Sequence, residues 1–307
     1  MKKIRTVIIG LGKIAHGYED NAGVVKRIKY PTHLSAIKKD KRFILVGGSD
    51  LSVKAQKVFA SKLNKPVALY ADYREMIKMQ KPDLAVVATP TGTHVRACKD
   101  IIKLGVKNIL CEKPIDYSLM DAQSLIKLAK KKRIKLAFNY FRVYDKRYKK
   151  LINLIKNEEF GKIQAIKIQY SKGIYNSATH VINLLEKIFG PVKKAEATAK
   201  ISGGQDPNVN FTLEFKDVTP SFRSFAGKSL ILSIEMKFDK KRLRIIKDKS
   251  KDFNIQIGTS LLDVYNNLYN FITANKKIAC GGQEALQTLR VADAVIKSFK
   301  FKKAISL

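Results

Sequence analysis

The chain has 307 residues, of which 45% are hydrophobic and 28% are charged, and its formal net charge at pH 7 is +34. This composition excludes a disordered chain and allows one large or two ordinary globular domains. No apolar run approaches the roughly 20 residues that a membrane-spanning helix requires, and the short apolar run behind the basic N-terminus leads into a glycine turn, so we expect a cytoplasmic protein.

Strand-like and helix-like segments alternate through the first 140 residues. The expected strands are residues 6–9, 43–47, 67–69, 84–89, 108–111 and 135–139. The expected helices between them are residues 32–39, 53–63, 73–78, 94–104 and 118–132. Because each crossover must bring the chain back to the same edge, this alternation predicts βαβ units and a parallel, Rossmann-type sheet.

After Tyr140 the pattern changes, because several strands follow one another. We expect a helix at 148–157, a strand at 163–170, a helix at 177–189, strands at 195–201, 209–215, 221–225, 230–238 and 242–247, and helices at 261–275 and 283–299. Consecutive strands indicate a largely antiparallel, open sheet. The prediction is therefore an α/β dinucleotide-binding domain over residues 1–117 and an α+β domain for substrate binding and oligomerisation over residues 118–307.

A glycine turn follows the first expected strand and reads Gly10-Leu11-Gly12-Lys13-Ile14-Ala15. In a dinucleotide-binding domain the first glycine permits the tight turn, the second lets the backbone approach the pyrophosphate, and the small third residue allows close helix packing. An ordinary glycine turn can have the same spacing, so the other strand ends decide between the two interpretations. The residues expected to contact the cofactor here are Gly10, Leu11, Gly12, Lys13 and Ile14.

Asp50 closes the second expected strand, where a carboxylate can accept hydrogen bonds from the adenosine ribose hydroxyls. The usual separation from the glycine turn is about 20 residues, and an additional loop over residues 17–30 accounts for the longer separation here. Because a carboxylate repels a 2′-phosphate, Asp50 favours NAD. Lys54, one helical turn later, leaves NADP as the alternative.

Two further strand ends carry candidate residues, Thr89-Pro90-Thr91-Gly92-Thr93-His94 and Cys111-Glu112-Lys113-Pro114. Ligands of a doubly wound sheet bind beyond the carboxyl ends of its strands. Lys113 can therefore hydrogen-bond a substrate oxygen and stabilise developing alkoxide charge; the alternative, in a chain so rich in lysine, is a solvated loop residue. The residues expected to contact the cofactor here are Thr89, Pro90, Thr91, His94, Glu112 and Lys113.

Together these strand ends, in this order and at these separations, resemble the glucose-fructose oxidoreductase/inositol dehydrogenase (Gfo/Idh/MocA) family, and Glu112-Lys113-Pro114 is the most telling signature. The resemblance covers the first 140 residues closely and continues more loosely through Phe160-Gly161-Lys162-Ile163, at the entry to the C-terminal sheet. It implies an NAD(P)-dependent oxidoreductase that acts on a sugar, polyol or sugar nucleotide.

The family also carries Asp-x-x-x-His-x-x-Asp on a helix that faces the nicotinamide, and the corresponding residues here are Asn176, His180 and Asn183. The resemblance implies that His180 is the catalytic base, a task for which a pKa near neutrality is suited. The alternative is a solvated helix face. Asparagine at both carboxylate positions leaves His180 without an anionic neighbour on this motif, and favours a substrate class other than inositol.

Arg142 follows the sixth expected strand and is a candidate for binding an anionic substrate group, with a role between the domains as the alternative. The expected substrate contacts are Lys113, Arg142, Asn176 and His180. Aromatic and basic residues also alternate over 140–150, a composition seen on base-stacking surfaces. A strand leading into an amphipathic helix explains that stretch better.

The preferred hypothesis is a dehydrogenase in which His180 removes the hydroxyl proton and Lys113 polarises the same oxygen. A dinucleotide-binding regulatory or assembly protein without turnover is the alternative, motivated by the two missing carboxylates. The positive charge either reflects lysines spread over every solvated face or attracts an anionic substrate; no motif indicates specific nucleic-acid or membrane binding. The open sheet suggests a homodimer or homotetramer.

The cysteines, Cys98, Cys111 and Cys280, have no metal-binding spacing, so we expect reduced thiols and no metal.

Overall fold

The computed structural model describes residues 3–227, 229–253, 258 and 260–307. The chain forms two compact units: unit 1 comprises Met1–Asp145 and Gly258–Gln283, and unit 2 comprises Lys146–Ile257 and Glu284–Leu307. Unit 1 extends past the boundary that we placed after Tyr117, because β6 (Lys135–Phe138) pairs with β5 (Asn108–Cys111) and completes the N-terminal sheet.

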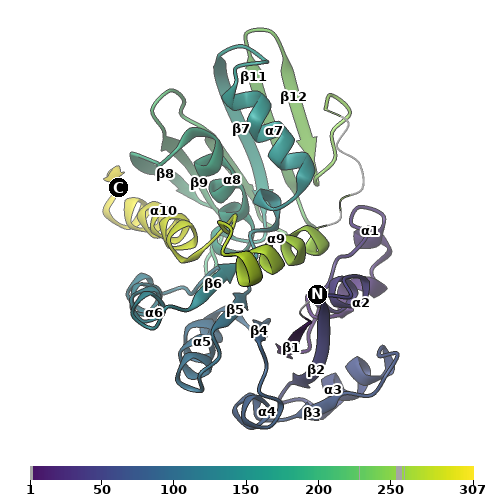
Figure 1. Ribbon diagram of the computed structural model, residues 1–307. Coiled ribbons are helices and arrows are strands. Elements are labelled where there is room, and N and C mark those ends of the chain that lie inside the picture. The colour runs from purple at the N-terminus through teal and green to yellow at the C-terminus, as the bar shows by residue number, and fades with distance from the viewer. Residues whose placement is uncertain (1–2, 228, 254–257, 259) are drawn as a thin grey trace. The chain divides into compact units, whose positions relative to one another are not determined.

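Unit 1 contains a six-stranded sheet in the order β3-β2-β1-β4-β5-β6, with every neighbouring pair parallel (Figure 1). The other strands are β1 (Ile4–Ile9), β2 (Phe43–Ser49), β3 (Ala68–Tyr70) and β4 (Leu84–Val87). The chain runs outward in both directions from β1, so the sheet is doubly wound, and its switch point lies between β1 and β4. All residues of β4 are fully buried, as expected of a strand covered on both faces.

The predicted helices of the first half are present, with small shifts of their ends. They are α2 (His33–Lys39), α3 (Val53–Ser61), α4 (Tyr73–Gln80), α5 (His94–Lys103) and α6 (Leu119–Lys131). α2 begins where it does because the Thr32 side chain accepts a hydrogen bond from the Ser35 backbone in a capping box. The additional loop before it contains a 3₁₀ turn, η1 (Gly17–Asp20), and the short helix α1 (Ala22–Val25).

A late segment of the chain belongs to unit 1. Helix α9 (Leu261–Ala274) contacts α2 and β6. Beyond it, the Cys280 carbonyl accepts hydrogen bonds from the Phe138 backbone N–H and from the Tyr144 hydroxyl, both at 3.0 Å. These bonds attach the segment to the end of β6, the last strand of the sheet.

Unit 2 is built on a seven-stranded sheet in the order β12-β11-β7-β10-β9-β8-β13. Its strands are β7 (Ile163–Ser171), β8 (Lys194–Lys200), β9 (Val209–Glu214), β10 (Ser221–Phe225), β11 (Leu232–Phe238), β12 (Arg242–Ile246) and β13 (Ile305–Ser306). The β7–β10 pair is parallel and the other pairs with a recorded register are antiparallel, which agrees with the predicted largely antiparallel sheet. The short β13 was not predicted.

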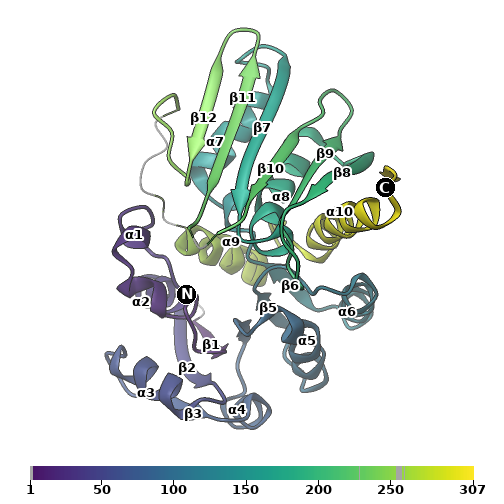
Figure 2. The same ribbon diagram turned by 180° about the vertical axis from the view of Figure 1, so that it is seen from behind.

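Helices α7 (Lys146–Lys156) and α8 (Thr179–Phe189) lie over one face of this sheet, which Figure 2 shows from the other side. Helix α10 (Gly282–Phe301) follows α9 in the chain. On the neighbouring strands β11 and β7, several of the side chains that alternate with the buried ones are polar and at least partly exposed. They include Lys167, Gln169, Ser233, Glu235 and Lys237.

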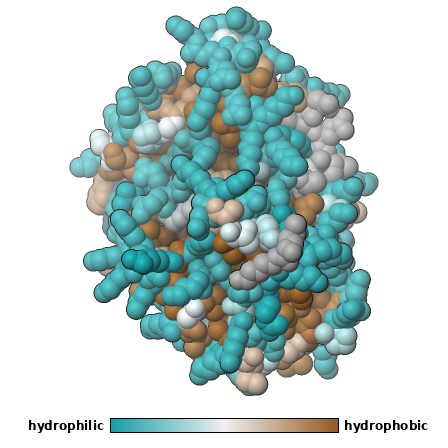
Figure 3. Space-filling view, viewed as in Figure 1, coloured by the Kyte–Doolittle hydropathy of each residue, from teal (hydrophilic) through white to brown (hydrophobic). Residues whose placement is uncertain are grey.

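The surface and the core reflect the composition. Hydrophilic side chains cover most of the face in Figure 3, with hydrophobic ones in small groups. Tyr140, Tyr144 and Tyr148 are buried, so the aromatic side chains of the 140–150 stretch form core and not a base-stacking surface. All cysteines are free and buried, as predicted. Among the helices of the described residues, none has both the length and the apolar composition to cross a membrane.

Candidate active site

The glycine turn after β1 has the geometry that its sequence predicts. Gly10 has φ +87°, and a Cβ atom there would lie 2.7 Å from the Ala88 carbonyl oxygen, so only glycine fits between β1 and the end of β4. At Gly12, by contrast, a Cβ atom would meet no described atom within 4 Å. The space in front of Gly12 is therefore open, as close approach of a pyrophosphate requires.

Asp50 holds this turn from the end of β2. Its Oδ2 accepts a hydrogen bond of 2.8 Å from the Leu11 backbone N–H, and its Oδ1 accepts one of 2.9 Å from the Ser52 N–H. A carboxylate has about four acceptor positions, so both oxygens can still accept from ribose hydroxyls. Asp50 thus has a second role that the sequence did not reveal, which is to fix the backbone of the glycine turn.

His16 also contacts the glycine turn. One of its ring nitrogens, Nε2, lies 2.9 Å from the Leu11 carbonyl oxygen, and its ring packs edge-on against Phe59 at 5.6 Å between centroids. Burial lowers the pKa of His16 from 6.5. A neutral His16 therefore donates its one ring proton to Leu11, while Lys13 and Gly12 remain exposed.

His94 joins the other two predicted strand ends. Its ring nitrogens lie 2.8 Å from the carbonyl oxygens of Thr89 and Pro114, and its side chain is buried. The residue therefore connects the turn after β4 to the turn that carries Lys113. We predicted a cofactor contact at His94; its ring nitrogens are instead directed to the two backbone carbonyls.

A buried polar cluster lies next to Lys113. Glu112 Oε1 accepts a hydrogen bond of 2.6 Å from Asn139 Nδ2 and lies 3.1 Å from His33 Nε2, while His33 Nδ1 lies 3.2 Å from the Tyr265 hydroxyl. Burial alone would raise the pKa of Glu112, but the hydrogen bonds from His33 and Asn139 outweigh it and lower that pKa. Glu112 is therefore a buried anion that fixes the backbone immediately before the half-buried Lys113.

Sequence reasoning missed His33 and Asn139 as partners of Glu112, and Tyr265 as the partner of His33. The three lie on α2, after β6 and on α9, and the pair His33–Tyr265 is separated by 232 residues. A histidine on the apolar side of a short helix is usually a core residue, so nothing local distinguished His33. Only the tertiary fold of unit 1 brings His33 and Asn139 to Glu112, and Tyr265 to His33.

Replacing His33 by alanine is expected to destabilise the protein by about 3 kcal/mol, because the buried Glu112 carboxylate loses a hydrogen-bonding partner. Urea denaturation followed by circular dichroism measures this change. Lys62→Ala is the control on the same unit, since Lys62 pairs with Asp20, whose side chain is 65% exposed. A loss below about 1 kcal/mol in His33→Ala, similar to a surface pair, would contradict the assigned role.

In unit 2, His180 is half-buried and stands in the first turn of α8. A single π-helical turn, η4 (Ile174–Ala178), precedes α8 and contains the exposed Asn176. Asn183 is buried and donates a hydrogen bond of 3.0 Å from Nδ2 to the Thr288 hydroxyl. The three residues of the motif therefore run from exposed to buried, and a wholly solvated helix face is excluded.

A carboxylate that the sequence motif lacks reaches the start of this helix from another loop. Asp206 accepts hydrogen bonds from the backbone N–H groups of Tyr175 and Asn176, at 2.7 and 3.0 Å. Gly173, with φ +84°, permits this contact, because a Cβ atom there would collide with the Asp206 carboxylate. The negative charge thus caps the positive end of the helical segment that carries His180.

The remaining candidate, Arg142, lies in the 3₁₀ turn η3 (Phe141–Val143) of unit 1. Its side chain is buried, and its guanidinium carbon lies 4.7 Å from the centre of the Phe141 ring. Lys113 and Arg142 therefore belong to unit 1, and Asn176 and His180 to unit 2. Within the described residues there is no group of three or more His, Cys, Asp or Glu side chains that could hold a metal ion.

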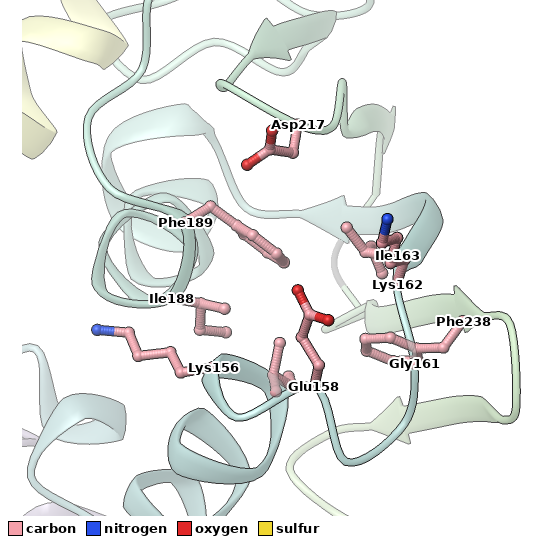
Figure 4. Close-up of a pocket in the computed structure, with 10 residues that line it drawn as sticks. Lys156, Glu158, Gly161, Lys162, Ile163, Ile188, Phe189, Asp217 and Phe238 are labelled. Carbon is pink, nitrogen blue, oxygen red and sulfur yellow. The ribbon is translucent and has the colours of Figure 1, made fainter.

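Unit 2 also contains a cavity of about 520 Å³ near the C-terminal end of α8. Figure 4 shows the carboxylates of Glu158 and Asp217 directed toward its centre, with Phe189 between them. Ile188 and Phe189 lie eight and nine residues after His180 on the same helix, which corresponds to more than about 10 Å along the helix axis. The cavity is therefore separate from His180.

Comparison with known proteins agrees with this architecture. Residues 4–140 match the family model GFO_IDH_MocA, described as an oxidoreductase family with an NAD-binding Rossmann fold. The inositol 2-dehydrogenase of Rhizobium meliloti is 23% identical over 268 residues, covering 73% of this chain and 81% of that protein. The uncharacterized oxidoreductase YrbE of Bacillus subtilis is 22% identical and covers 100% of this chain and 97% of its own.

A solved structure shares the fold over the whole chain. The WlbA dehydrogenase of Bordetella pertussis, in complex with NADH and UDP-GlcNAcA, superposes with a TM-score of 0.81 at 19% identity and covers 100% of this chain and 99% of its own. At that identity the likeness establishes the fold of both units. The reaction has to be inferred from the residues of the site.

Proposed function

Because this chain belongs to the Gfo/Idh/MocA family of oxidoreductases, we propose that it is an NAD-dependent dehydrogenase in which Lys113 and His180 act on one hydroxyl group of a sugar-like substrate. The reaction class is the interconversion of a secondary alcohol and a ketone, and the substrate class comprises sugars, polyols and sugar nucleotides. The observation that carries the proposal is the pair of turns after β1 and β5, held by Asp50 and Glu112.

The described residues fit the dinucleotide. The open space at Gly12 would take the pyrophosphate, and the Asp50 carboxylate, held by the Leu11 N–H, would accept hydrogen bonds from the ribose hydroxyls. The residues that would hold the cofactor are those of the three strand ends: Gly10, Leu11, Gly12, Lys13, Ile14, Asp50, Thr89, Pro90, Thr91, Glu112 and Lys113, with His94 fixing the turns. When bound, NAD accepts a hydride from the carbinol carbon or NADH returns one.

The protein's own residues supply binding, orientation and proton transfer. The Lys113 ammonium donates a hydrogen bond to the substrate oxygen and stabilises negative charge that develops there. In the oxidative direction an imidazole nitrogen of His180 takes the hydroxyl proton, and in the reductive direction it returns that proton. Asn176 donates and accepts hydrogen bonds with neighbouring hydroxyl groups, and Arg142 provides the positive charge for an anionic substituent.

A substrate with a phosphate or carboxylate group suits this chain better than a neutral polyol. The net charge of +34 attracts anions, and the inositol dehydrogenase motif is altered at Asn176 and Asn183. WlbA binds a sugar nucleotide that carries such groups. We therefore favour a sugar nucleotide or sugar phosphate over free inositol.

A dehydrogenase screen tests the proposal. The purified protein is incubated with NAD or NADP and a panel of free sugars, inositols, sugar phosphates and nucleotide sugars, and the nicotinamide absorbance is followed. We expect turnover with an anionic member of the panel. Tight NAD binding without turnover of any member would favour the alternative, a dinucleotide-binding regulatory or assembly protein.

Asp50→Asn is expected to lower the ratio of NAD to NADP affinity by about tenfold, because the charge that repels a 2′-phosphate is lost. The amide oxygen of the substituted side chain still accepts one backbone hydrogen bond, so the glycine turn keeps part of its support. Fluorescence titration with both cofactors measures the ratio, and Asp72→Asn, which changes the residue that caps α4, is the matched control. An unchanged ratio would remove Asp50 from cofactor selection.

The uncovered, polar face of the seven-stranded sheet is the surface through which we propose that copies of the chain form a homodimer or homotetramer. Lys167, Glu235 and Lys237 on that face provide charges of both signs for a polar interface. Sedimentation velocity at micromolar concentration should show the oligomer; a monomer alone would contradict it.

A further inference from the structure

A buried hydrogen-bonded cluster joins α8, the helix that carries His180, to α10. The Thr288 hydroxyl oxygen, which is fully buried, lies 2.6 Å from Glu186 Oε2, 3.0 Å from Asn183 Nδ2 and 3.1 Å from the Glu284 carbonyl oxygen. The other carboxyl oxygen, Glu186 Oε1, is also buried, and no hydrogen-bond partner for it is present in the described part of the chain. All four residues belong to unit 2.

The number of hydrogen-bond donors and acceptors in this cluster indicates whether Glu186 is protonated or ionised. A hydroxyl group donates one hydrogen bond and accepts two. The Asn183 amide nitrogen can only donate to Thr288, and the Glu284 carbonyl can only accept from it. If Glu186 is ionised, two acceptors compete for the single Thr288 proton. If Glu186 is protonated, it donates to Thr288, and every contact is satisfied.

Burial acts in the same direction. It raises the pKa of Glu186 from 4.5 to about 8, against the opposing effect of the Thr288 hydrogen bond. Part of the Glu186 residue remains accessible, so its proton can exchange with solvent. The other titratable groups on these helices near Glu186 in sequence are His180 and Lys187 on α8 and Glu284 on α10.

We propose that Glu186 is a positioning residue that works as a neutral carboxylic acid: its proton occupies one acceptor site of Thr288, and Thr288 in turn holds the amide of Asn183. The inference rests on the proposed function, since it concerns the helix that carries His180. With Thr288 fixed as an acceptor, Asn183 presents its NH₂ group to α10. The side chain of Asn183 lies on the side of α8 that it shares with His180, three residues earlier.

The charge of Glu186 also affects the electrostatic surroundings of His180. An anion at Glu186 would place a negative charge two turns from His180 and favour the imidazolium, which cannot accept a proton. A neutral Glu186 places no negative charge at this position of α8. Ionisation of Glu186 at higher pH would turn the Thr288 hydroxyl toward the carboxylate and away from Glu284.

The protonation state can be measured without any substrate. The carboxyl carbon of Glu186 is followed by ¹³C nuclear magnetic resonance in a pH titration, with its signal assigned by its loss in Glu186→Gln. We expect a midpoint near 8, where the pKa has been raised from 4.5. A midpoint near 4.5 would overturn the proposal whether or not the protein is a dehydrogenase, so this outcome is independent of the proposed function.

Stability against pH provides a second measurement without substrate. The raised pKa means that the folded protein binds the Glu186 proton more tightly than the unfolded chain does, so this stabilisation is complete below about 4.5 and is lost as the pH rises through about 8. The free energy of unfolding of Glu186→Gln, measured over the same range, should lack this decline. Parallel curves for the two proteins would contradict the proposal.

Four variants, two at Glu186 and two at Thr288, separate positioning from simple packing. Glu186→Gln can still donate to Thr288, so we expect kcat within about twofold of wild type, whereas Glu186→Leu and Thr288→Val should lower kcat by about tenfold with little change in KM. Thr288→Ser should restore activity, and Glu186→Gln should remove one ionisation from the alkaline side of the pH–rate profile. Equal losses in Glu186→Gln and Glu186→Leu, or an unchanged profile, would overturn the positioning role.

Discussion

Replacing His180 by alanine should lower kcat by about a thousandfold and leave the Kd for NAD within about threefold of wild type. General base catalysis contributes typically 10²- to 10⁴-fold, and His180 belongs to unit 2, whereas the glycine turn belongs to unit 1. Lys113→Ala should cause a loss of similar size through the oxygen that it stabilises. Stopped-flow and steady-state assays with the best substrate of the screen measure kcat, and fluorescence titration measures the Kd.

Two surface variants serve as matched controls for this pair. Lys187→Ala lies on the same helix as His180, and Lys107→Ala lies before β5, the strand that leads to Lys113. Both should retain wild-type kcat. If His180→Ala and Lys113→Ala also retained full activity, the assigned chemistry would be wrong, although the fold would stand.

The two glycines of the first turn should separate protein stability from cofactor binding. Gly10→Ala places a Cβ atom 2.7 Å from a backbone oxygen at φ +87°, so the unfolding free energy should fall by about 3 kcal/mol or more. Gly12→Ala meets no described atom within 4 Å and should leave stability unchanged. Its methyl group would occupy the space of the pyrophosphate, so NAD affinity should fall by about a hundredfold.

Thermal and urea denaturation, together with NAD titration, measure both effects on the same samples. Gly203→Ala is the control, because a Cβ atom there also meets nothing within 4 Å and the position belongs to unit 2. An unstable Gly12→Ala protein, or one that binds NAD normally, would contradict the assignment of the open space to the dinucleotide.

The fold could be predicted largely from local pattern. Apolar runs such as Leu84–Val87 and the glycine turn at Gly10 report a buried parallel strand and its phosphate-binding end, because both depend on neighbouring residues alone. The return of Leu261–Ala274 to unit 1 could not be predicted, since it depends on packing against α2 and β6, which are far away in the sequence.

The candidate site divides in the same way. Lys113, Asp50 and His180 were named from motifs, whereas the residues that hold them in place were not. His33 fixes Glu112 across 79 residues, and Thr288 reaches Asn183 across 105. Asp206 caps the helical segment that leads to His180 from a separate loop, 30 residues beyond Asn176. Such contacts depend on tertiary packing. A single threonine, histidine or acidic residue has no sequence pattern around it that would predict its distant partner.

The most direct test of the account is hydride transfer from a substrate labelled with deuterium at its carbinol carbon. Wild-type protein incubated with NAD and the labelled alcohol that the screen identifies should give NADH with deuterium on the nicotinamide ring, detected by mass spectrometry, and the Lys113→Ala/His180→Ala double variant should give about a thousandfold less in the same time. Absence of label in the NADH formed by wild-type protein, or equal labelling by the double variant, would contradict the proposed dehydrogenase.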